Sequence, residues 1–173
     1  MITLPSLHIP YVLAKYRKNK PIARPLTTGE IALCLRIFGT AFDTSTVKII
    51  ACAYLPWQAD DIFIAPNGNL FTTTKHYQDD YSTAALSYQQ IFIHEMTHVF
   101  QHQQGVNVLY QGAWLQSLYY LSGKRYNPYA YQFDPAKSFW AYNIEQQACI
   151  GEAIFLGYRP NIIRPHRTSH HHP

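Results

Sequence analysis

The segment from Ile91 to Phe100 constrains the fold more than any other part of the chain. It reads I-F-I-H-E-M-T-H-V-F, so that two histidines and a glutamate stand among apolar side chains. His94 and His98 are four residues apart, and on an α-helix both imidazoles project from one face and can bind one zinc ion. Three titratable groups in so apolar a helix are costly to bury unless something satisfies them. The segment therefore predicts a buried helix that carries a metal site.

The motif also supplies a base for chemistry at that metal. Glu95 directly follows the first histidine, where its carboxylate can reach a water bound to zinc. Zinc lowers the pKa of such a water, and the carboxylate can take its proton as the water attacks a carbonyl group. The H-E-x-x-H pattern is typical of zinc metallopeptidases. We therefore expect Zn²⁺ as the cofactor, Glu95 as the catalytic base and hydrolysis of peptide bonds as the reaction.

A third protein ligand is needed, because catalytic zinc usually has three protein ligands and a water. His102 continues the spacing but lies another turn, about 6 Å, along a straight helix, so we expect it at the surface or in a supporting position. The acids after the motif are Asp134, Glu145 and Glu152. Asp134 precedes a proline and is typical of a helix start. We expect Glu145 to be the third metal ligand; Glu152 or another histidine is left as an alternative, although an exposed helix carboxylate is the preferred interpretation of Glu152.

A tyrosine or histidine often stabilises the oxyanion in such enzymes. The chain has 14 tyrosines, and its sequence does not single one out. Tyr142, three residues before Glu145, is the nominated catalytic residue, and His76 is the second choice.

The pattern of the chain predicts one α+β domain, mostly helical, with a small antiparallel sheet. The expected helices cover about 28–38, 88–104, 108–121 and 135–156, and the expected strands cover 47–53, 61–65 and 70–75. Thr27 with Glu30, and Ser87 with Gln90, have the spacing of capping boxes. The turn 66–69 (P-N-G-N) predicts that the last two strands pair as a hairpin. We expect the edge of 70–75 to bind substrate by strand addition.

The charge distribution divides the chain into three parts. Residues 1–25 and 159–173 together hold eight of the 14 Lys and Arg and no acid, whereas the middle holds all ten acids. We therefore expect an extended basic arm (1–25), a folded domain (26–158) and a basic, His-rich tail (159–173). Because the positive charge lies in Pro-containing ends and not on a folded face, a nucleic-acid partner is not expected.

No run is long and apolar enough for a membrane span, and no signal peptide is evident. The three separated cysteines predict free thiols.

Several segments resemble a known group of proteins. Residues 92–102 (F-I-H-E-M-T-H-V-F-Q-H) are similar to the signature of small bacterial zincins related to Rhs and VgrG proteins, which accompany type VI secretion systems. Residues 29–32, 64–68 and 142–148 also resemble that group, so the likeness spans roughly 26–158. It implies a zincin fold with His94, His98 and Glu145 as zinc ligands and Glu95 as base. It further implies an antibacterial effector or processing peptidase, made in the cytoplasm and delivered to the periplasm or a target cell without a signal peptide.

The resemblance also implies partners and one departure from the family pattern. The implied partners are a peptide or peptidoglycan substrate, a VgrG or Rhs secretion component and an immunity protein. The typical gluzincin has an acid four residues after its ligand glutamate, where this chain has Cys149. We therefore expect another acid, such as Asp79 or Asp80, to orient a zinc histidine.

Two other classes of function stay open from the sequence. One is a catalytically silent adaptor that keeps the zinc fold to bind a secretion component. The other is a structural zinc protein in which His102 or Cys149 closes the site as a fourth ligand.

Overall fold

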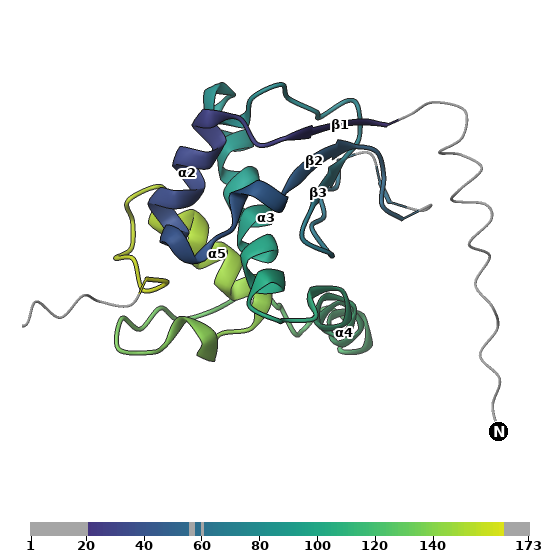
Figure 1. Cartoon of the computed structure of the whole chain (residues 1–173). Coiled ribbons are helices and arrows are strands. Elements are labelled where there is room, and N and C mark those ends of the chain that lie inside the picture. The colour runs from purple at the N-terminus through teal and green to yellow at the C-terminus, as the bar shows by residue number, and fades with distance from the viewer. Residues whose placement is uncertain (1–20, 56–57, 60, 165–173) are drawn as a thin grey trace, which may run out of the picture.

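A computed structural model describes residues 21–55, 58–59 and 61–164, and its elements establish an α+β fold (Figure 1). The helices are α2 (Thr28–Phe38), α3 (Leu86–Gln103), α4 (Val108–Leu121) and α5 (Ile144–Phe155), and the strands are β1 (Ile22–Pro25), β2 (Lys48–Ala51) and β3 (Leu70–Thr72). Four 3-10 helices cover Gly39–Ala41, Thr44–Thr46, Tyr81–Thr83 and Phe139–Ala141. The prediction of an α+β domain with a small sheet is confirmed.

Helix α3 is the centre of the core. Phe92, Ile93, Met96 and Val99 on α3 are completely buried. In Figure 1, α3 lies between the sheet on one side and helices α2 and α5 on the other. The apolar residues of the H-E-x-x-H segment thus serve as the packing surface of the molecule, as their composition predicts.

Helix α2 begins as its sequence predicts. The Thr27 hydroxyl accepts a hydrogen bond from the Glu30 backbone N–H at 3.1 Å, and the Glu30 carboxylate accepts one from the Thr27 N–H at 2.8 Å. This reciprocal pair is the expected capping box, and it satisfies two donors at the start of the helix. The helix ends at Gly39, whose φ of 71° is in the left-handed region that favours glycine.

The sheet is mixed, so the expectation of a wholly antiparallel sheet is wrong, and the expected hairpin is present only as a single antiparallel bridge. Strand β2 pairs with β1 antiparallel and with β3 parallel. The segment 61–65 forms no strand and contributes one antiparallel bridge, between Ile64 and Phe71. The backbone N–H and carbonyl of Phe71 both bond Ile64, at 2.9 and 3.1 Å. The edge of β3 that faces away from β2 is therefore already paired at this position. Strand addition of a substrate there would first have to displace Ile64.

Two helix starts differ from the prediction. The N-cap of α3 is Ala85, without a side-chain hydrogen bond, so Ser87 and Gln90 form no capping box. Helix α5 begins at Ile144, with Asn143 as its N-cap, and Asp134 is not a helix start: its carboxylate accepts from the Ala136 N–H at 2.9 Å. That short-range bond stabilises a turn in place of a helix.

The ends of the described region join the folded body. Residues 22–25, expected to belong to the arm, form β1, and Arg24 in this strand makes an ion pair with Glu30 at 2.7 Å. Asn161 donates a hydrogen bond to the Ile37 carbonyl at 2.8 Å, and Ile163 is buried in the core. The division into arm, domain and tail stays a prediction, since residues 1–20 and 165–173 lie outside the described residues.

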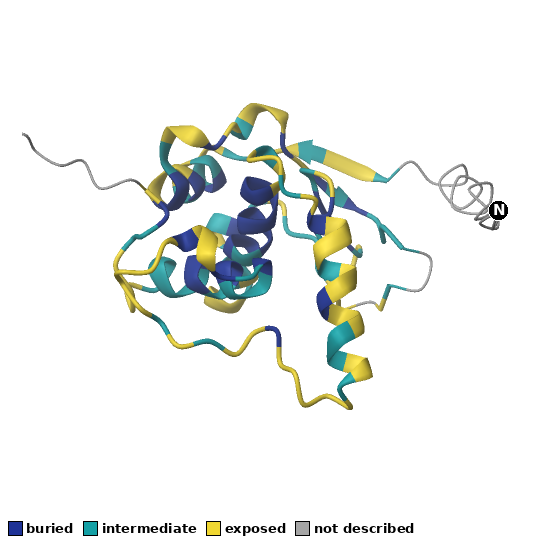
Figure 2. Ribbon diagram, turned by 90° about the horizontal axis from the view of Figure 1, so that it is seen from below, coloured by how far each residue is buried: buried dark blue, intermediate teal, exposed yellow. Residues whose placement is uncertain are grey.

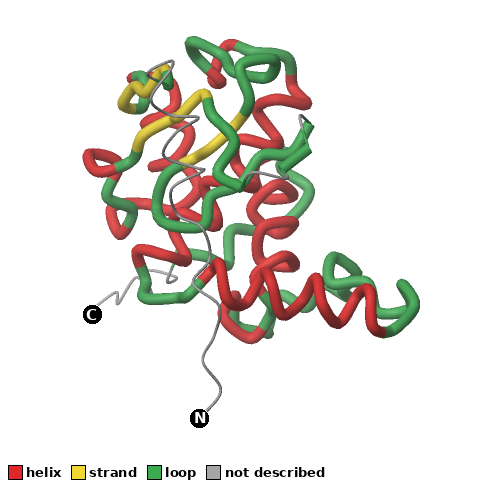
Figure 3. The backbone as a smooth tube through the Cα atoms, turned by 90° about the vertical axis from the view of Figure 1, so that its right-hand side faces the viewer, coloured by secondary structure: helices red, strands yellow, loops and turns green. Residues whose placement is uncertain are grey.

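Helix α4 projects from the body, as the side view shows (Figure 3). Most of its surface is exposed (Figure 2), including the large apolar side chains of Leu109, Tyr110, Trp114, Tyr120 and Leu121. Its inner side is fixed by Val108 and Leu115, which pack against Ile144 at the start of α5.

No helix of the described residues combines the length and the hydropathy that a membrane span requires. The three cysteines are free, as predicted.

Candidate metal centre

Helices α3 and α5 bring three potential metal ligands together. The Nε2 atoms of His94 and His98 lie 3.5 and 3.6 Å from the Oε2 atom of Glu145. One ligand atom from each of the three residues lies within 4.8 Å of the other two. The two histidines come from α3 and Glu145 comes from the first turn of α5.

These spacings suit a tetrahedral zinc ion. With metal–ligand distances of about 2.0–2.2 Å, two ligand atoms of a tetrahedral site are about 3.3–3.6 Å apart. The separations of 3.5 and 3.6 Å fall in this range. Two imidazoles and a carboxylate are also a donor set that zinc accepts. The residues present therefore fit the metal that the motif predicts.

The acid that orients His94 is Glu152, and not Asp79 or Asp80. Its Oε1 atom lies 2.6 Å from His94 Nδ1. A carboxylate can only accept, so the Nδ1 atom carries a proton, and it is the Nε2 atom that can lose its proton and offer a lone pair to a metal. Asp79 is exposed, and the Asp80 carboxylate accepts from the Ser82 N–H and hydroxyl. Glu152 is half-buried, which corrects its interpretation as an exposed helix carboxylate.

A fully buried glutamine orients the second histidine. Gln101 Oε1 lies 2.8 Å from His98 Nδ1, and Gln101 Nε2 donates to the Ile144 carbonyl and to Gln147 Oε1. Because the amide nitrogen is used in this way, the oxygen must face His98, and the Nε2 atom of His98 is again free for a metal. The sequence analysis did not single out Gln101, although a polar residue three positions after His98 on an apolar helix is a usable signal.

Glu95 is buried within electrostatic reach of both histidines. It is 7% exposed, and its Oε2 atom is buried without a hydrogen-bond partner among the described residues. A buried carboxylate oxygen without a partner is costly. A water on the neighbouring metal would provide the missing partner.

The charges of the site depend on each other. Burial alone would lower the pKa of His94, but hydrogen bonds with Glu145 and Glu152 outweigh it and raise this pKa to about 10. Burial would raise the pKa of Glu145, but His94 and His98 hold it well below its usual range. Burial raises the pKa of Glu95 despite both histidines. Without a metal, the site therefore holds a protonated His94 against an ionised Glu145.

Tyr129, which the sequence analysis did not select, lies at the metal centre. Its ring centroid is 6.5 Å from that of His94, and burial, with the nearby Glu145, raises its pKa to about 12. Hydrogen bonds from α5 hold the loop on both sides of it, from Asn143 Nδ2 to the Pro128 carbonyl and from Gln146 Nε2 to the Ala130 carbonyl. The placement depends on contacts between distant segments, so no local pattern marks it.

The nominated Tyr142 is engaged elsewhere. Its hydroxyl interacts with the backbone N–H and carbonyl of Asp134, at 2.9 and 3.3 Å, and its ring is buried. The role of Tyr142 stays a prediction, which this hydrogen bonding does not favour. His76 pairs with the Tyr88 hydroxyl at 2.9 Å.

The two residues considered as a fourth ligand lie outside the group of His94, His98 and Glu145. His102 is exposed, and its ring lies close to Gly68, where an added Cβ would come within 2.9 Å of it. Cys149 lies near His94 and Glu152, as part of a second group that could hold an ion. Burial, with Glu152 and Glu145, raises the pKa of Cys149 to about 12, so its sulfur is a neutral thiol before any metal binds.

Comparisons with known proteins identify the family. No protein-family model matches the chain. The chain is 46% identical over 134 residues to the type VI secretion system spike protein VgrG2b of Pseudomonas aeruginosa (strain PAO1), a match that covers 77% of this chain and 13% of that protein. Its fold is similar to the solved effector domain of P. aeruginosa VgrG2b, with a TM-score of 0.71 and 40% identity, covering 85% of this chain and 83% of that domain. The chain therefore belongs to the family of the VgrG2b effector domain.

Proposed function

We propose that this protein is a zinc metallopeptidase and acts as an effector of a type VI secretion system. His94, His98 and Glu145 are its zinc ligands, and Glu95 is its catalytic base. Its substrate is a protein or the peptide stem of peptidoglycan.

The observation that carries this proposal is the geometry of the three ligand atoms. Separations of 3.5 and 3.6 Å match a tetrahedral ion, and the described residues add no fourth protein ligand to the group. A metal held by three protein groups keeps one position for water or substrate, whereas a structural zinc site is closed by four. The buried Oε2 atom of Glu95 lacks a partner, as expected for a carboxylate that acts on that water.

Each residue of the site has a distinct task. A bound zinc ion would supply a Lewis acid that lowers the pKa of a water. Glu95 accepts the proton of this water and passes it to the leaving amine. Glu152 and Gln101 hold the two imidazoles in the tautomer that leaves Nε2 free. The phenol of Tyr129, beside Glu145, donates a hydrogen bond to the oxygen on which negative charge develops.

The effector role rests on the family. The VgrG2b domain that the chain resembles is an effector domain, and the whole VgrG2b relative is a spike protein of the secretion system. The chain spans 13% of the length of that relative. We infer delivery by the secretion apparatus with a VgrG-type component as partner, and an immunity protein in the producing cell.

The test compares products and metal content in matched variants. Wild type and Glu95→Gln, both loaded with zinc, are incubated with purified sacculi and with a denatured protein mixture, and the products are identified by mass spectrometry. We expect new peptide ends from wild type only, and one zinc per chain in both proteins. Glu145→Gln should lose both zinc and activity.

Two results would overturn the proposal that the protein is a peptidase. One is equal toxicity of wild type and Glu95→Gln in cells that receive the protein, which would indicate an adaptor. The other is a zinc ion that hydroxamate inhibitors cannot reach, which would indicate a structural site.

A further inference from the structure

We propose that Lys124, with the hydroxyl of Tyr119, forms a carboxylate-binding subsite beside the metal centre, and that Tyr129 lies between this subsite and the metal. The substrate is then a peptide that presents a free carboxylate close to the bond that is cut. This carboxylate is either the C-terminus of the peptide or an acidic side chain. The inference rests on the proposed function and names the substrate class of that site.

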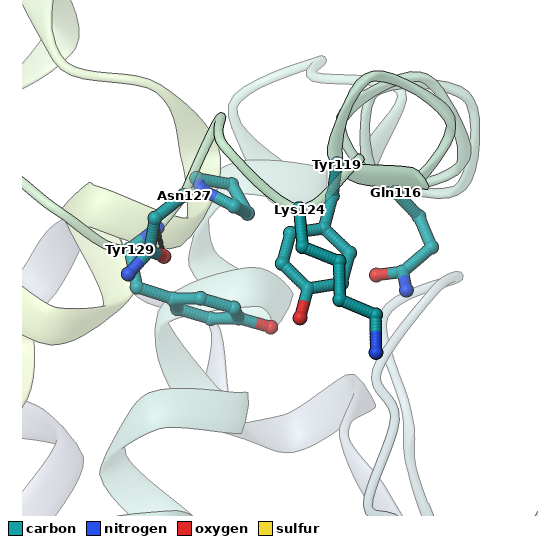
Figure 4. A pocket seen from close by; sticks show the side chains of 6 residues that line it. Gln116, Tyr119, Lys124, Asn127 and Tyr129 are labelled. Carbon is teal, nitrogen blue, oxygen red and sulfur yellow. Dashed lines mark hydrogen bonds between the residues drawn. The ribbon is translucent and has the colours of Figure 1, made fainter. Parts of the chain in front are cut away.

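A cavity separates the C-terminal end of α4 from the loop that follows it. Its volume is about 510 Å³, and it is lined by Gln116, Tyr119, Lys124, Asn127, Pro128 and Tyr129. In Figure 4, Gln116 and Tyr119 from α4 and Lys124 from the turn after it extend in the same direction, and the hydroxyl of Tyr129 points toward them from the loop. An ammonium, two phenol groups and an amide therefore line one space.

The charge of Lys124 has no partner in the described structure. No Asp or Glu occurs between Glu95 and Asp134, a stretch that includes all of α4 and both sides of the cavity. The ion pairs among the described residues are those of Glu30, Glu145 and Glu152, and none involves Lys124. An ammonium with neighbouring phenol donors favours an anionic acceptor, because hydrogen bonds to a charged group are the strong ones.

The backbone at Lys124 is unusual as well. Its φ is 66°, and no other non-glycine residue of the described ranges has a positive φ. The conformation costs about 1–2 kcal/mol for an L-residue other than glycine. It is fixed by a hydrogen bond of 2.8 Å from the Lys124 N–H to the Tyr119 carbonyl. With the bond from the Gly123 N–H to the Tyr120 carbonyl, it forms the C-terminal cap of α4, which holds Lys124 close to Tyr119.

Tyr129 connects the cavity to the metal centre. It lines the cavity, and its ring also lies 6.5 Å from that of His94, centroid to centroid. The Tyr129 N–H donates to Asn127 Oδ1 at 3.0 Å, so a second cavity residue helps to fix the backbone at Tyr129. A carboxylate held by Lys124 therefore places the adjoining part of a peptide at the metal side of the same tyrosine.

The first experiment measures binding without catalysis. Zinc-loaded protein is titrated with N-acetyl-alanine and with N-acetyl-alaninamide, and NMR follows the Tyr119, Lys124 and Tyr129 signals. We expect binding of the carboxylate only, weakened about tenfold in Lys124→Met and kept in Lys124→Arg. Arg125→Met is the matched control, because Arg125 is the neighbouring base and does not line the cavity. Equal binding of the amide, or unchanged binding in Lys124→Met, overturns the subsite.

The second experiment uses a peptide library whose members have either free or amidated C-termini, with and without Asp or Glu. Cleavage that depends on Glu95 is profiled by mass spectrometry. We expect a preference of at least about tenfold for one kind of carboxylate, lost in Lys124→Met. Preference for free C-termini identifies a terminal carboxylate, and preference for Asp or Glu identifies a side chain.

The two experiments separate the two proposals. Glu95-dependent cleavage without any carboxylate preference overturns the subsite and leaves the peptidase standing. Carboxylate binding that depends on Lys124, in a protein that cuts nothing, supports the subsite and overturns the peptidase.

Discussion

His94 makes use of both nitrogens of its ring. Its Nδ1 atom bonds Glu152 at 2.6 Å, and its Nε2 atom lies 3.5 Å from Glu145. The carboxylate on one side fixes the tautomer, and the carboxylate on the other side is a potential ligand of the same metal. Glu152 follows Glu145 by seven residues, which is two turns of α5, so one helix supplies both.

The protonation of His94 predicts how zinc binding depends on pH. A raised pKa of about 10 stabilises the metal-free fold below the ordinary pKa of histidine, and this contribution disappears as the pH rises through about 10. At pH 7, zinc must displace that proton, so zinc binding should release about one proton from His94 and strengthen as the pH rises. Calorimetry in two buffers of different ionisation enthalpy measures the number released.

Glu152→Gln is the variant that tests this link. It keeps an acceptor for Nδ1 but removes the charge that helps to raise the pKa of His94. Glu145 still raises this pKa, so the proton release at pH 7 should stay close to one, but it should fall off at a lower pH than in wild type. The same pH dependence of proton release in both proteins would contradict the assignment of that proton to His94.

At the scale of elements, the close approach of α3 and α5 brings the candidate metal ligands together. Gly151 on α5 faces Thr97 on α3, and an added Cβ would come within 2.4 Å of the Thr97 hydroxyl oxygen. That hydroxyl is buried and held by its bond to the Ile93 carbonyl at 2.8 Å. A side chain at position 151 would therefore separate the two helices that carry the ligands.

Gly151→Ala should lower the free energy of unfolding by about 1–3 kcal/mol, even after the gain in helix propensity. It should also weaken zinc binding, because α5 carries Glu145. Urea unfolding and zinc titration measure the two effects. Gly112→Ala is the matched control on α4, where an added Cβ would lie 3.9 Å from Ile144, an ordinary contact. Equal stability of the two variants, or no recovery when Thr97→Ala is added to Gly151→Ala, would argue against the steric explanation.

At the scale of the molecule, the Arg24–Glu30 ion pair links strand β1 of the sheet to helix α2. Both guanidinium nitrogens of Arg24 bond the Glu30 carboxylate at 2.7 Å, and one also donates to the Gln78 carbonyl. The completely buried Glu30 carboxylate accepts from the Tyr81 N–H as well. Strand β1, helix α2 and the 3-10 helix Tyr81–Thr83 therefore meet at one carboxylate.

Arg24→Met should lower the free energy of unfolding by about 3–5 kcal/mol, because it leaves the buried charge of Glu30 without its partner. Chemical denaturation measures this loss. Arg36→Met is the control, since Arg36 is exposed and lies over the Phe155 ring at 5.1 Å, a contact worth about 1 kcal/mol at most. Similar losses in both variants would show that the pair does not fasten the fold.

Much of the fold could be predicted from sequence patterns that are local to one helix. Helix α4 has the predicted bounds, 108–121, and the Thr27–Glu30 capping box forms as its spacing indicates. The sheet was misjudged because strand pairing is a contact between distant segments. The Asp61–Ala65 segment has the local pattern of a strand, but in the structure only Ile64 pairs, in one bridge with Phe71. Strand β3 instead pairs along its length with β2, in parallel.

The sequence by itself determined that His94, Glu95 and His98 share a buried helix, because the helical period and the apolar neighbours fix that locally. With four Glu in the chain, it also reduced the choice of a third ligand to a few residues. The tertiary structure alone decided that Glu152 and Gln101 orient the histidines, that Tyr129 lies beside Glu145, and that Lys124 lines the neighbouring cavity. Those contacts join α3, α5 and the loop after α4, which are far apart in the sequence. Contacts between distant segments produce no periodic pattern in the sequence, so they could not be inferred from it.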